Sequence, residues 1–408
     1  MRQDVLVLTT LDYAVEKNQR CQHVARALAN QYGAAVVIAK HRNISVRTSE
    51  RVRKLLPSVR VYREGPVKVY DLNPPLNQSF AKPFRFIGLI SEILVVISML
   101  LLFLSNVRRR FPLCYAEGPW ETLVALVLKA FGKVECIIYG DIDLVPAFQV
   151  RPLRILLTSM VENFTIRRAD LVVCTGNLLA EKRREELGVH PVVIHNGVNY
   201  RIFSAGAVKE DHPPTIIYFG NFEERYSGIS IALEGFTKIR REIEGIRLTL
   251  IGPDPDGAVE RRIRKLGIDR FVLKLDPVPY IELPYYIRRS DIGYALFPPN
   301  PLRTYAFPLK VIEYMAGGLA VVGTKGTETE LVVEKYGCGF TIPFDVDAYV
   351  EAIVDLFSNR ERLAMMAENG VKHATSFDWD RLMNDMLESI GEVYGTGIRS
   401  ARNKFGDR

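Results

Sequence analysis

The chain has 408 residues, of which 48% are hydrophobic and 25% are charged. This length exceeds what one ordinary hydrophobic core needs, and the composition excludes a disordered chain, so we expect two globular domains. The net charge of +7 calls for an acidic partner, such as a diphosphate ligand, anionic lipid or nucleic acid. Nucleic acid ranks last among these, because no zinc-finger, helix-turn-helix or RNA-recognition pattern accompanies the charge.

Five cysteines are scattered along the chain, and none forms a Cys-x-x-Cys pair. A zinc site or a disulfide framework is therefore not expected, and a reducing compartment fits best. The first ten residues have the pattern of a buried strand and not of a secretory signal. We predict a cytoplasmic protein that needs no cofactor.

In the first half of the chain, short apolar runs alternate with amphipathic stretches, which is typical of a parallel sheet covered by helices. We predict an N-terminal Rossmann-like domain over residues 1–205. Its strands are expected at 4–9, 34–39, 59–62, 67–71, 113–116, 134–139, 171–174 and 192–194. Its helices are expected at 18–31, 121–130, 153–168 and 178–187.

Residues 86–104 form a long apolar run with a single charge, Glu92, and the run is followed by Arg108, Arg109 and Arg110. The run is just long enough to cross a bilayer, but a true span would place strands of one sheet on opposite sides of the membrane. Two interpretations remain. The segment is either a buried helix that covers the sheet or a helix in the interface of an anionic membrane, anchored by the arginines. Its excess of apolar surface favours membrane contact.

The alternating pattern starts again after a polar, proline-containing break at 206–214. Strands are expected at 215–220, 247–251, 291–296, 319–322 and 340–342, and helices at 229–243, 259–266 and 311–316. We therefore predict a C-terminal Rossmann-like domain over 206–378. A terminal helix over 379–394 and a basic tail over 395–408 follow, and the tail is expected to fray.

Residues 307–332 carry the most informative stretch, FPLKVIEYMAGGLAVVGTKGTETELV. Pro308 suits the first turn of a helix, and two consecutive glycines end that helix. Glu313 then lies in the middle of the helix, where its carboxylate can accept two hydrogen bonds from a vicinal diol such as a ribose. The backbone N–H groups of residues 306–309 suit a diphosphate. A mid-helix glutamate is usually a solvated residue, but the apolar surroundings of Glu313 favour a function.

This stretch resembles the retaining glycosyltransferases of the GT-B fold, specifically the large family 4 of the group 1 glycosyl transferases. Phe307, Pro308, Lys310 and Glu313, followed by Tyr-Met-Ala, match the subgroup pattern F/L-P-x-K-x-x-E-Y-M-A. Further pieces resemble the family in the correct order, at 169–175, 193–199, 217–228, 250–253 and 377–379.

The resemblance implies an α/β protein with two doubly wound Rossmann-like domains that face each other across a cleft. It also implies a nucleotide-diphosphate sugar as the donor, bound mainly by the second domain. The acceptor would be a lipid-linked or polysaccharide molecule bound by the first. Transfer would retain the anomeric configuration and need no metal.

The roles of individual residues follow from the same resemblance. Glu313 would bind the donor ribose. In the turn where the family has G-R-L-x-x-x-K-G, the chain has Gly220 followed by Asn221, and Ser227 replaces the lysine. Arg225 is the nearest cation, so we predict that it stabilises the departing diphosphate, with Lys310 as the second candidate. Arg225 lies in a charged turn, where a plain surface role is an equal alternative.

The chain departs from the family at other positions of the site as well. Tyr305 stands where the first glutamate of the E-x7-E motif is expected, next to Pro308 in the predicted donor site. Gly140 and Asp141 stand where a first-domain strand usually ends in His-Asp. Asp141 is the predicted acceptor-side base or hydroxyl contact, and a plain helix-capping role is its alternative.

A metal-dependent transferase would need an Asp-x-Asp at the end of a strand. The chain has four such tripeptides, starting at Asp141, Asp254, Asp345 and Asp378, which suggests chance. We therefore predict no metal site. Two other functions remain open: a nucleotide-sugar epimerase or hydrolase on the same fold, and a catalytically silent nucleotide-sugar-binding subunit.

Overall fold

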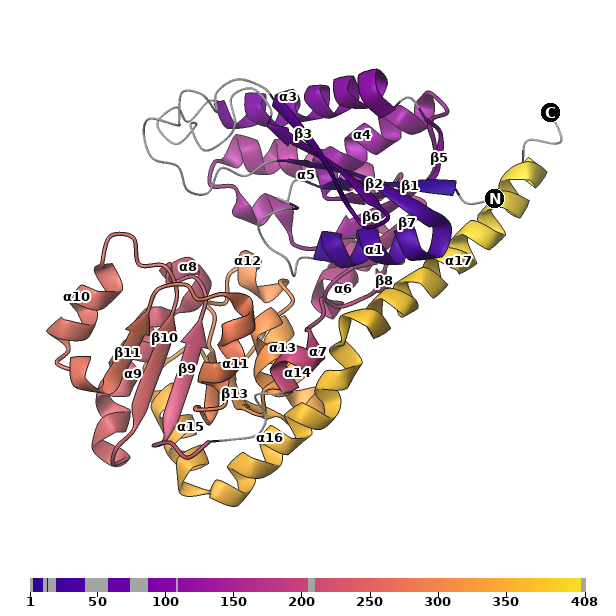
Figure 1. Ribbon diagram of the computed structural model, residues 1–408. Coiled ribbons are helices and arrows are strands. Elements are labelled where there is room, and N and C mark those ends of the chain that lie inside the picture. Colours follow the sequence, from indigo (N-terminus) through magenta and orange to yellow (C-terminus); the bar gives the residue numbers. More distant parts are fainter. Residues whose placement is uncertain are drawn as a thin grey trace. The chain divides into compact units, whose positions relative to one another are not determined.

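The computed structural model describes residues 3–9, 13, 20–40, 58–73, 87–107, 109–204 and 210–404 (Figure 1). The chain divides into two compact units. The N-terminal unit comprises Met1–Thr175, Leu179–Ile194 and Met383–Arg408, and the C-terminal unit comprises Gly176–Leu178 and His195–Leu382.

The sheet of the N-terminal unit has eight strands in the order β3-β4-β2-β1-β5-β6-β7-β8. Its strands are β1 (Gln3–Thr9), β2 (Gly33–Lys40), β3 (Ser58–Glu64), β4 (Val67–Asn73), β5 (Phe111–Glu117), β6 (Val134–Asp141), β7 (Leu171–Cys174) and β8 (Val192–Val193). The sheet is parallel, as predicted, except at one edge, where β3 pairs with β4 in the antiparallel direction. The two strands are joined by a two-residue turn with Gly65 at a φ of 57°, which is the short connection that antiparallel neighbours allow.

Helices cover both faces of this sheet. They are α1 (Arg20–Tyr32), α3 (Ile87–Leu102), α4 (Pro119–Ala130), α5 (Pro152–Ile166) and α6 (Asn177–Leu187), with a π-helical turn at Phe103–Val107 and a 3-10 turn at Val145–Phe148. The chain moves one way along the sheet from β1 to β2, and the other way from β4 to β5, β6 and β7. Because such crossovers are right-handed, α1 lies on one face and α3, α4 and α5 lie on the other (Figure 1).

The apolar segment 86–104 becomes α3 and the π-helical turn that follows it; Phe86 itself and Arg108 lie outside the described residues. Val95, Met99 and Phe103 are buried in the core of the unit, whereas Ile97 and Leu101 are exposed. The helix therefore covers the sheet with one side and exposes apolar side chains on the other. Within the described residues, no helix is both long enough and apolar enough to cross a membrane.

The sheet of the C-terminal unit has six strands, all parallel, in the order β11-β10-β9-β12-β13-β14. They are β9 (Thr215–Phe219), β10 (Arg247–Ile251), β11 (Val272–Leu275), β12 (Ile292–Ala295), β13 (Ala320–Thr324) and β14 (Gly339–Ile342). The longer helices are α9 (Ile229–Glu242), α10 (Ala258–Lys265), α13 (Leu309–Ala316), α14 (Glu328–Tyr336), α15 (Val346–Ser358) and α16 (Arg360–Ala374). Shorter ones are α7 (Tyr200–Ser204), α8 (Glu224–Ser227), α11 (Leu283–Ile287) and α12 (Pro301–Thr304).

The last helix, α17, runs from Trp379 to Lys404. The helix therefore extends beyond the predicted 379–394 into the predicted basic tail, and residues 405–408 lie outside the described part. The edge strand β11 was not predicted. Residues 206–209 of the predicted break between the domains also lie outside the described part.

Candidate functional site

Each sheet has one point at which the strand order reverses. In the N-terminal unit it lies between β1 and β5, and in the C-terminal unit between β9 and β12. At such a point the flanking helices lie on opposite faces, which leaves a crevice beyond the carboxyl ends of the two strands where ligands bind.

In the C-terminal unit, β9 is followed by Gly220, whose N–H donates to the carbonyl of Ile251 at 2.8 Å. Gly220 has a φ of 134°, a region that favours glycine. A Cβ atom placed on Gly220 would lie 2.5 Å from Cε and 2.7 Å from Nζ of Lys310. The absence of a side chain at this position therefore gives the Lys310 ammonium its place at the end of β9.

Lys310 and Glu313 lie one turn apart on α13, and Glu313 is buried. Burial, together with the neighbouring charge of Arg303, lowers the pKa of Lys310 to about 8, whereas Glu313 acts in the opposite direction. Burial also raises the pKa of Glu313 to about 7, against the opposite effects of Lys310 and a hydrogen bond from Tyr280. The pKa values of both groups are thus shifted toward neutral pH. An anionic ligand would favour the charged form of Lys310.

Arg303 is a second cation in this crevice, and sequence reasoning missed it. Its guanidinium carbon lies 4.1 Å from the centroid of the Phe297 ring, and Lys310 Nζ lies 5.7 Å from the same centroid. The backbone of Phe297 is fixed just beyond β12, because its N–H donates to the Thr324 hydroxyl at 2.7 Å and its carbonyl accepts from that hydroxyl at 2.9 Å. Two cations therefore flank one aromatic ring beside the end of β9, an arrangement suited to a diphosphate.

The remaining predicted donor residues lie around this crevice. Asn221 is exposed, and its side-chain oxygen accepts from the Glu223 N–H at 2.8 Å, which closes the turn after β9. Tyr305 follows α12 as its C-terminal cap, and Pro308 is the residue before α13. The Leu309 N–H donates to the carbonyl of Phe307 at 3.0 Å. This donor of the predicted anion site is therefore already engaged by a local turn.

Arg225 lies on the four-residue helix α8, with a side chain 53% exposed. Its guanidinium lies over the Tyr226 ring, 4.5 Å from the centroid, and Nε lies 3.5 Å from a Glu223 oxygen. Its guanidinium also donates to the Tyr226 hydroxyl at 2.5 Å, so Arg225 is half-exposed and its partners are local.

In the N-terminal unit, Thr9 ends β1 and Glu117 ends β5, so both lie at the point of reversal. The Thr9 hydroxyl donates to Oε2 of Glu117 at 2.7 Å, and Oε1 is buried without a hydrogen-bond partner in the described structure. Burial raises the pKa of Glu117 to about 7, although Thr9, Arg20 and Tyr115 act in the opposite direction. A buried carboxylate oxygen with nothing to accept from is costly, and a ligand hydroxyl would satisfy it.

Tyr115 explains why Gly140 replaces the histidine of the family pattern. A Cβ atom on Gly140 would lie 2.5 Å from the Tyr115 hydroxyl oxygen, so only glycine fits under this ring. Arg20 Nε donates to the same hydroxyl at 3.3 Å, and a second guanidinium nitrogen donates to the carbonyl of Ile194 at 2.9 Å. The space of a side chain at position 140 is thus filled from the neighbouring strand.

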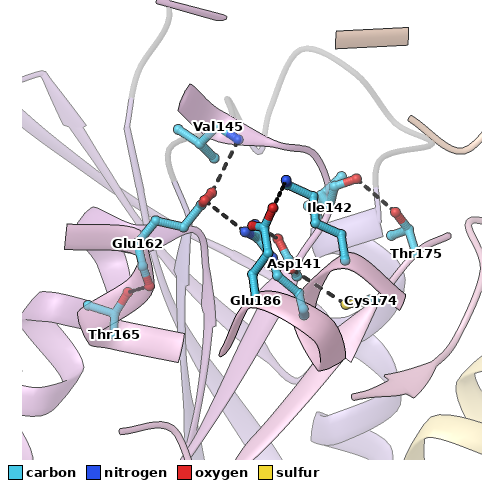
Figure 2. Close-up of polar contacts among 10 residues, drawn as sticks. Asp141, Ile142, Val145, Glu162, Thr165, Cys174, Thr175 and Glu186 are labelled. Atoms are coloured by element: carbon cyan, nitrogen blue, oxygen red, sulfur yellow. Dashed lines mark hydrogen bonds and ion pairs between the residues drawn. The ribbon is translucent and has the colours of Figure 1, made fainter. Parts of the chain in front are cut away.

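Asp141 belongs to a buried ionic cluster at the end of β6. Figure 2 shows its carboxylate with Glu162 on one side and Cys174 on the other. Its two oxygens accept from Arg183 at 2.8 and 3.2 Å, and Arg183 also donates to Glu162 at 3.0 Å. Burial alone would lower the pKa of Arg183, but the charge and hydrogen bonds of Asp141 raise it. Both oxygens of Asp141 are therefore engaged in tying α5 and α6 to the sheet.

Among the described ranges, no group of three or more His, Cys, Asp or Glu side chains lies close enough together to hold a metal ion. Asp254 illustrates how the Asp-x-Asp tripeptides are used. Its oxygens accept from the backbone N–H groups of Val259 and Glu260 at 3.2 and 3.0 Å. In the same way, Asp345 caps α15.

Comparison with known proteins supports these assignments at the level of family and fold. Residues 213–359 match the family model "Glycosyl transferases group 1", which confirms the resemblance to group 1 enzymes. A Bacillus subtilis glycosyltransferase named for teichuronic acid biosynthesis is 25% identical over 242 residues, covering 55% of this chain and 58% of that protein. The phosphatidyl-myo-inositol mannosyltransferase of Mycobacterium leprae is 23% identical over 234 residues, covering 56% and 60%. The chain thus spans somewhat over half the length of these curated relatives.

Solved structures match the whole chain. Sucrose-phosphate synthase from Thermosynechococcus elongatus has a TM-score of 0.76 at 17% identity, covering 97% of this chain and 100% of the other. The Anabaena protein HepE in complex with UDP has a TM-score of 0.66 at 15% identity, covering 95% and 100%. With two doubly wound parallel-sheet units, the chain has the GT-B fold, and the predicted fold class is confirmed.

Proposed function

We propose that the protein is a glycosyltransferase that takes its sugar from a nucleotide-diphosphate sugar. The observation that carries this proposal is the group of charges beside the end of β9 in the C-terminal unit, where Lys310 and Arg303 offer two cations near the buried carboxylate of Glu313. The two cations suit a diphosphate, and the carboxylate suits a ribose diol. The matches to glycosyltransferases favour transfer over an epimerase, a hydrolase or a silent binding subunit.

On the donor side, Lys310 and Arg303 bind the diphosphate, and Glu313 accepts hydrogen bonds from the ribose hydroxyls. Gly220 leaves room for Lys310, Asn221 shapes the turn beside it, and Tyr305 and Pro308 border the same crevice. Arg225 acts later, when the bond between the sugar and the diphosphate breaks and negative charge grows on the leaving group. Its exposure leaves it free to move toward that charge.

On the acceptor side, Glu117 binds the attacking hydroxyl through its unpartnered oxygen. Asp141 acts indirectly, as a positioning residue that holds the carboxyl edge of β6 through Arg183. This replaces the direct contact that the family pattern implies for Asp141.

We further propose that transfer retains the anomeric configuration and needs no metal. The bond between the anomeric carbon of the donor sugar, C1, and the diphosphate oxygen breaks. The electron pair of this bond stays on the phosphate oxygen. The acceptor oxygen then bonds to C1 on the same face, and its proton passes to that phosphate oxygen. The cations of the crevice take the place that a metal would have in balancing the diphosphate charge. Sugar transfer is expected to continue in the presence of EDTA. Activity that is lost in EDTA and restored by manganese or magnesium would contradict the proposal that no metal is needed.

The acceptor is proposed to be lipid-linked or a polysaccharide, and the protein to work on the cytoplasmic face of a membrane. The names of the two curated relatives, which refer to teichuronic acid and to phosphatidyl-myo-inositol, support this choice. The exposed side of α3 and the nearby Arg109 and Arg110 support membrane contact.

A thermal-shift screen against UDP-, GDP-, dTDP- and ADP-sugars tests the central proposal, because a bound ligand stabilises the fold according to its saturation. One of these donors is expected to raise the melting temperature of the parent and to leave that of Lys310→Met unchanged. A coupled assay with the same donor then separates transfer from hydrolysis. If none of the four stabilises the parent, the donor site is wrong.

A further inference from the structure

The helix α5 is amphipathic, but its inward side is mostly polar and its outward side is apolar. Its most buried residues are mostly polar: Thr158, Glu162 and Thr165, with Ile166. Its outward side carries a stripe of exposed large apolar residues at helical spacing, Leu153, Leu156, Met160 and Phe164, of which Leu153 is 66% and Met160 59% exposed. Val150, just before the helix, is 82% exposed. Isolated exposed apolar residues are ordinary, but a continuous stripe along a whole helix is not.

The orientation of α5 is fixed by its inward polar residues. Glu162 is held by Arg183 at 3.0 Å and by the Val145 N–H at 3.2 Å, and the buried Thr165 hydroxyl donates within the helix to the Glu162 carbonyl at 2.9 Å (Figure 2). Turning the helix to bury its apolar stripe would break this cluster and leave buried charges unpaired. The outward apolar stripe is therefore a built feature of the fold.

Positive charge borders the stripe. The only acidic residue of α5, Glu162, is buried, whereas Arg154 lies on the helix, and Arg167 and Arg168 follow it and are exposed. The Arg168 guanidinium carbon lies 3.9 Å from the centroid of the Phe164 ring. Apolar side chains edged by arginines match the two layers of an anionic membrane surface, hydrocarbon and phosphate.

A second stripe lies on the same face of the unit. α4 contacts both α3 and α5. α3 exposes Ile93, Ile97 and Leu101, and the π-helical turn after it exposes Leu104. Apolar side chains therefore project from both helices that flank α4.

We propose that the outward side of α5, from Val150 to Phe164, is a docking surface for anionic lipid, with Arg154, Arg167 and Arg168 binding lipid phosphates. This deepens the proposed membrane location, on which it rests only for the choice of a lipid bilayer as the partner. The proposal assigns to α5 a role that the apolar α3 segment alone was expected to have.

The test is sedimentation of the full chain with vesicles of phosphatidylcholine alone and of phosphatidylcholine with 30% phosphatidylglycerol (about this fraction gives a marked surface charge). The parent is expected to bind the anionic vesicles and to be released by salt. Leu156→Asp with Met160→Asp should weaken this binding at least about tenfold, because two side chains can no longer enter the hydrocarbon. Arg167→Glu with Arg168→Glu should weaken it to anionic vesicles only.

The matched control is Leu273→Asp with Ile281→Asp, two exposed apolar residues of the C-terminal unit that should leave vesicle binding unchanged. The double variant Ile97→Asp with Leu101→Asp measures how much α3 contributes to vesicle binding. Far-UV circular dichroism and melting curves confirm that each variant is folded.

Several outcomes would overturn the proposal. The α5 variants could bind vesicles as tightly as the parent, or the parent could fail to bind either kind of vesicle. Light scattering could also show a parent dimer that the α5 variants convert to a monomer, without vesicle binding, which would make a second copy the partner. Failure of the proposed function is separate: a parent that binds vesicles but neither binds nor transfers any nucleotide sugar keeps the docking surface and loses the enzyme.

Discussion

Two buried pairs of opposite charge lie on the carboxyl side of the two sheets, and they differ in how well their charges are satisfied. In the N-terminal unit, Arg183 makes two hydrogen bonds to Asp141 and a third to Glu162. In the C-terminal unit, burial shifts the pKa values of Lys310 and Glu313 toward the neutral forms. The first pair is complete within the fold, and the second gains from a ligand that brings negative charge and hydroxyl groups.

This difference separates stability from function more clearly than residue type does. Asp141 has the chemistry of a catalytic base, but the fold uses both of its oxygens. Glu313 is also buried and Lys310 is partly buried beside it, and the fold uses them less fully. The predictions below disturb one pair at a time.

The largest effect is expected from Arg183→Leu, which leaves Asp141 and Glu162 buried without their cation. Removing one partner of a buried ion pair costs about 3–5 kcal/mol, and urea unfolding monitored by circular dichroism measures it. Arg184→Leu is the matched control, since the Arg184 side chain is 40% exposed and should change stability little. The opposite result would be unchanged stability of Arg183→Leu with a loss of donor affinity in the folded protein. It would assign ligand binding, and not stability, to the Arg183–Asp141 pair.

A smaller effect, on binding, is expected from Glu313→Gln. The shape is kept, but one acceptor oxygen becomes a donor and the charge is lost. Hydrogen bonds to a charged group contribute about 1.5–3 kcal/mol, so donor affinity should fall by about one to two orders of magnitude in calorimetric titrations. The melting temperature should stay the same or rise, because burying the charge is no longer required. A lower melting temperature with unchanged donor affinity would make Glu313 structural.

The pH dependence of donor binding follows from the same pair. Below about pH 7, Glu313 gains a proton and loses its acceptor charge, and above about pH 8, Lys310 loses its positive charge. Donor affinity should therefore be highest between these values and fall by at most about tenfold per unit above pH 8. The same titration with Lys310→Met should be weak and flat above pH 8. A parent whose affinity rises from pH 8 to 9 would contradict the assignment of Lys310 to the diphosphate.

Much of the fold was predictable because its signals are local. The alternation of apolar runs and amphipathic stretches located the strands of both sheets except β11. That strand, Val272–Leu275, is four residues long, lies at the sheet edge and contains a lysine, so no apolar run marks it. The antiparallel β3 was missed because a strand pattern does not reveal its direction. The turn at Gly65-Pro66 was the available signal.

The sites were less predictable, because they depend on contacts between distant residues. Arg303 lies in the short helix α12 with no match to a motif, and only the fold brings it beside Phe297 and Lys310. Gly140 looked like a lost histidine, whereas the structure shows a position filled by Tyr115. Glu117 follows a buried strand in the same way as Asp141 does, so the sequence contained a signal for it, but no pattern distinguished the two carboxylates.

The smallest effect is expected from Arg225→Ala. This variant tests whether a residue outside the two buried pairs takes part in the proposed reaction. Because Arg225 is half-exposed and its partners, Tyr226 and Glu223, lie on or next to its own short helix, it should contribute little to donor affinity in the ground state. If it moves toward the departing diphosphate, its loss should lower kcat by about two- to five-fold while the affinity for the donor changes less. Arg303→Ala provides the contrast, since a cation already fixed over Phe297 should affect donor binding first. Steady-state kinetics with calorimetric donor titrations on both variants distinguish these cases. Equal losses of affinity in Arg225→Ala and Arg303→Ala would place both arginines on the bound diphosphate, and an unchanged kcat in Arg225→Ala would return that residue to the surface.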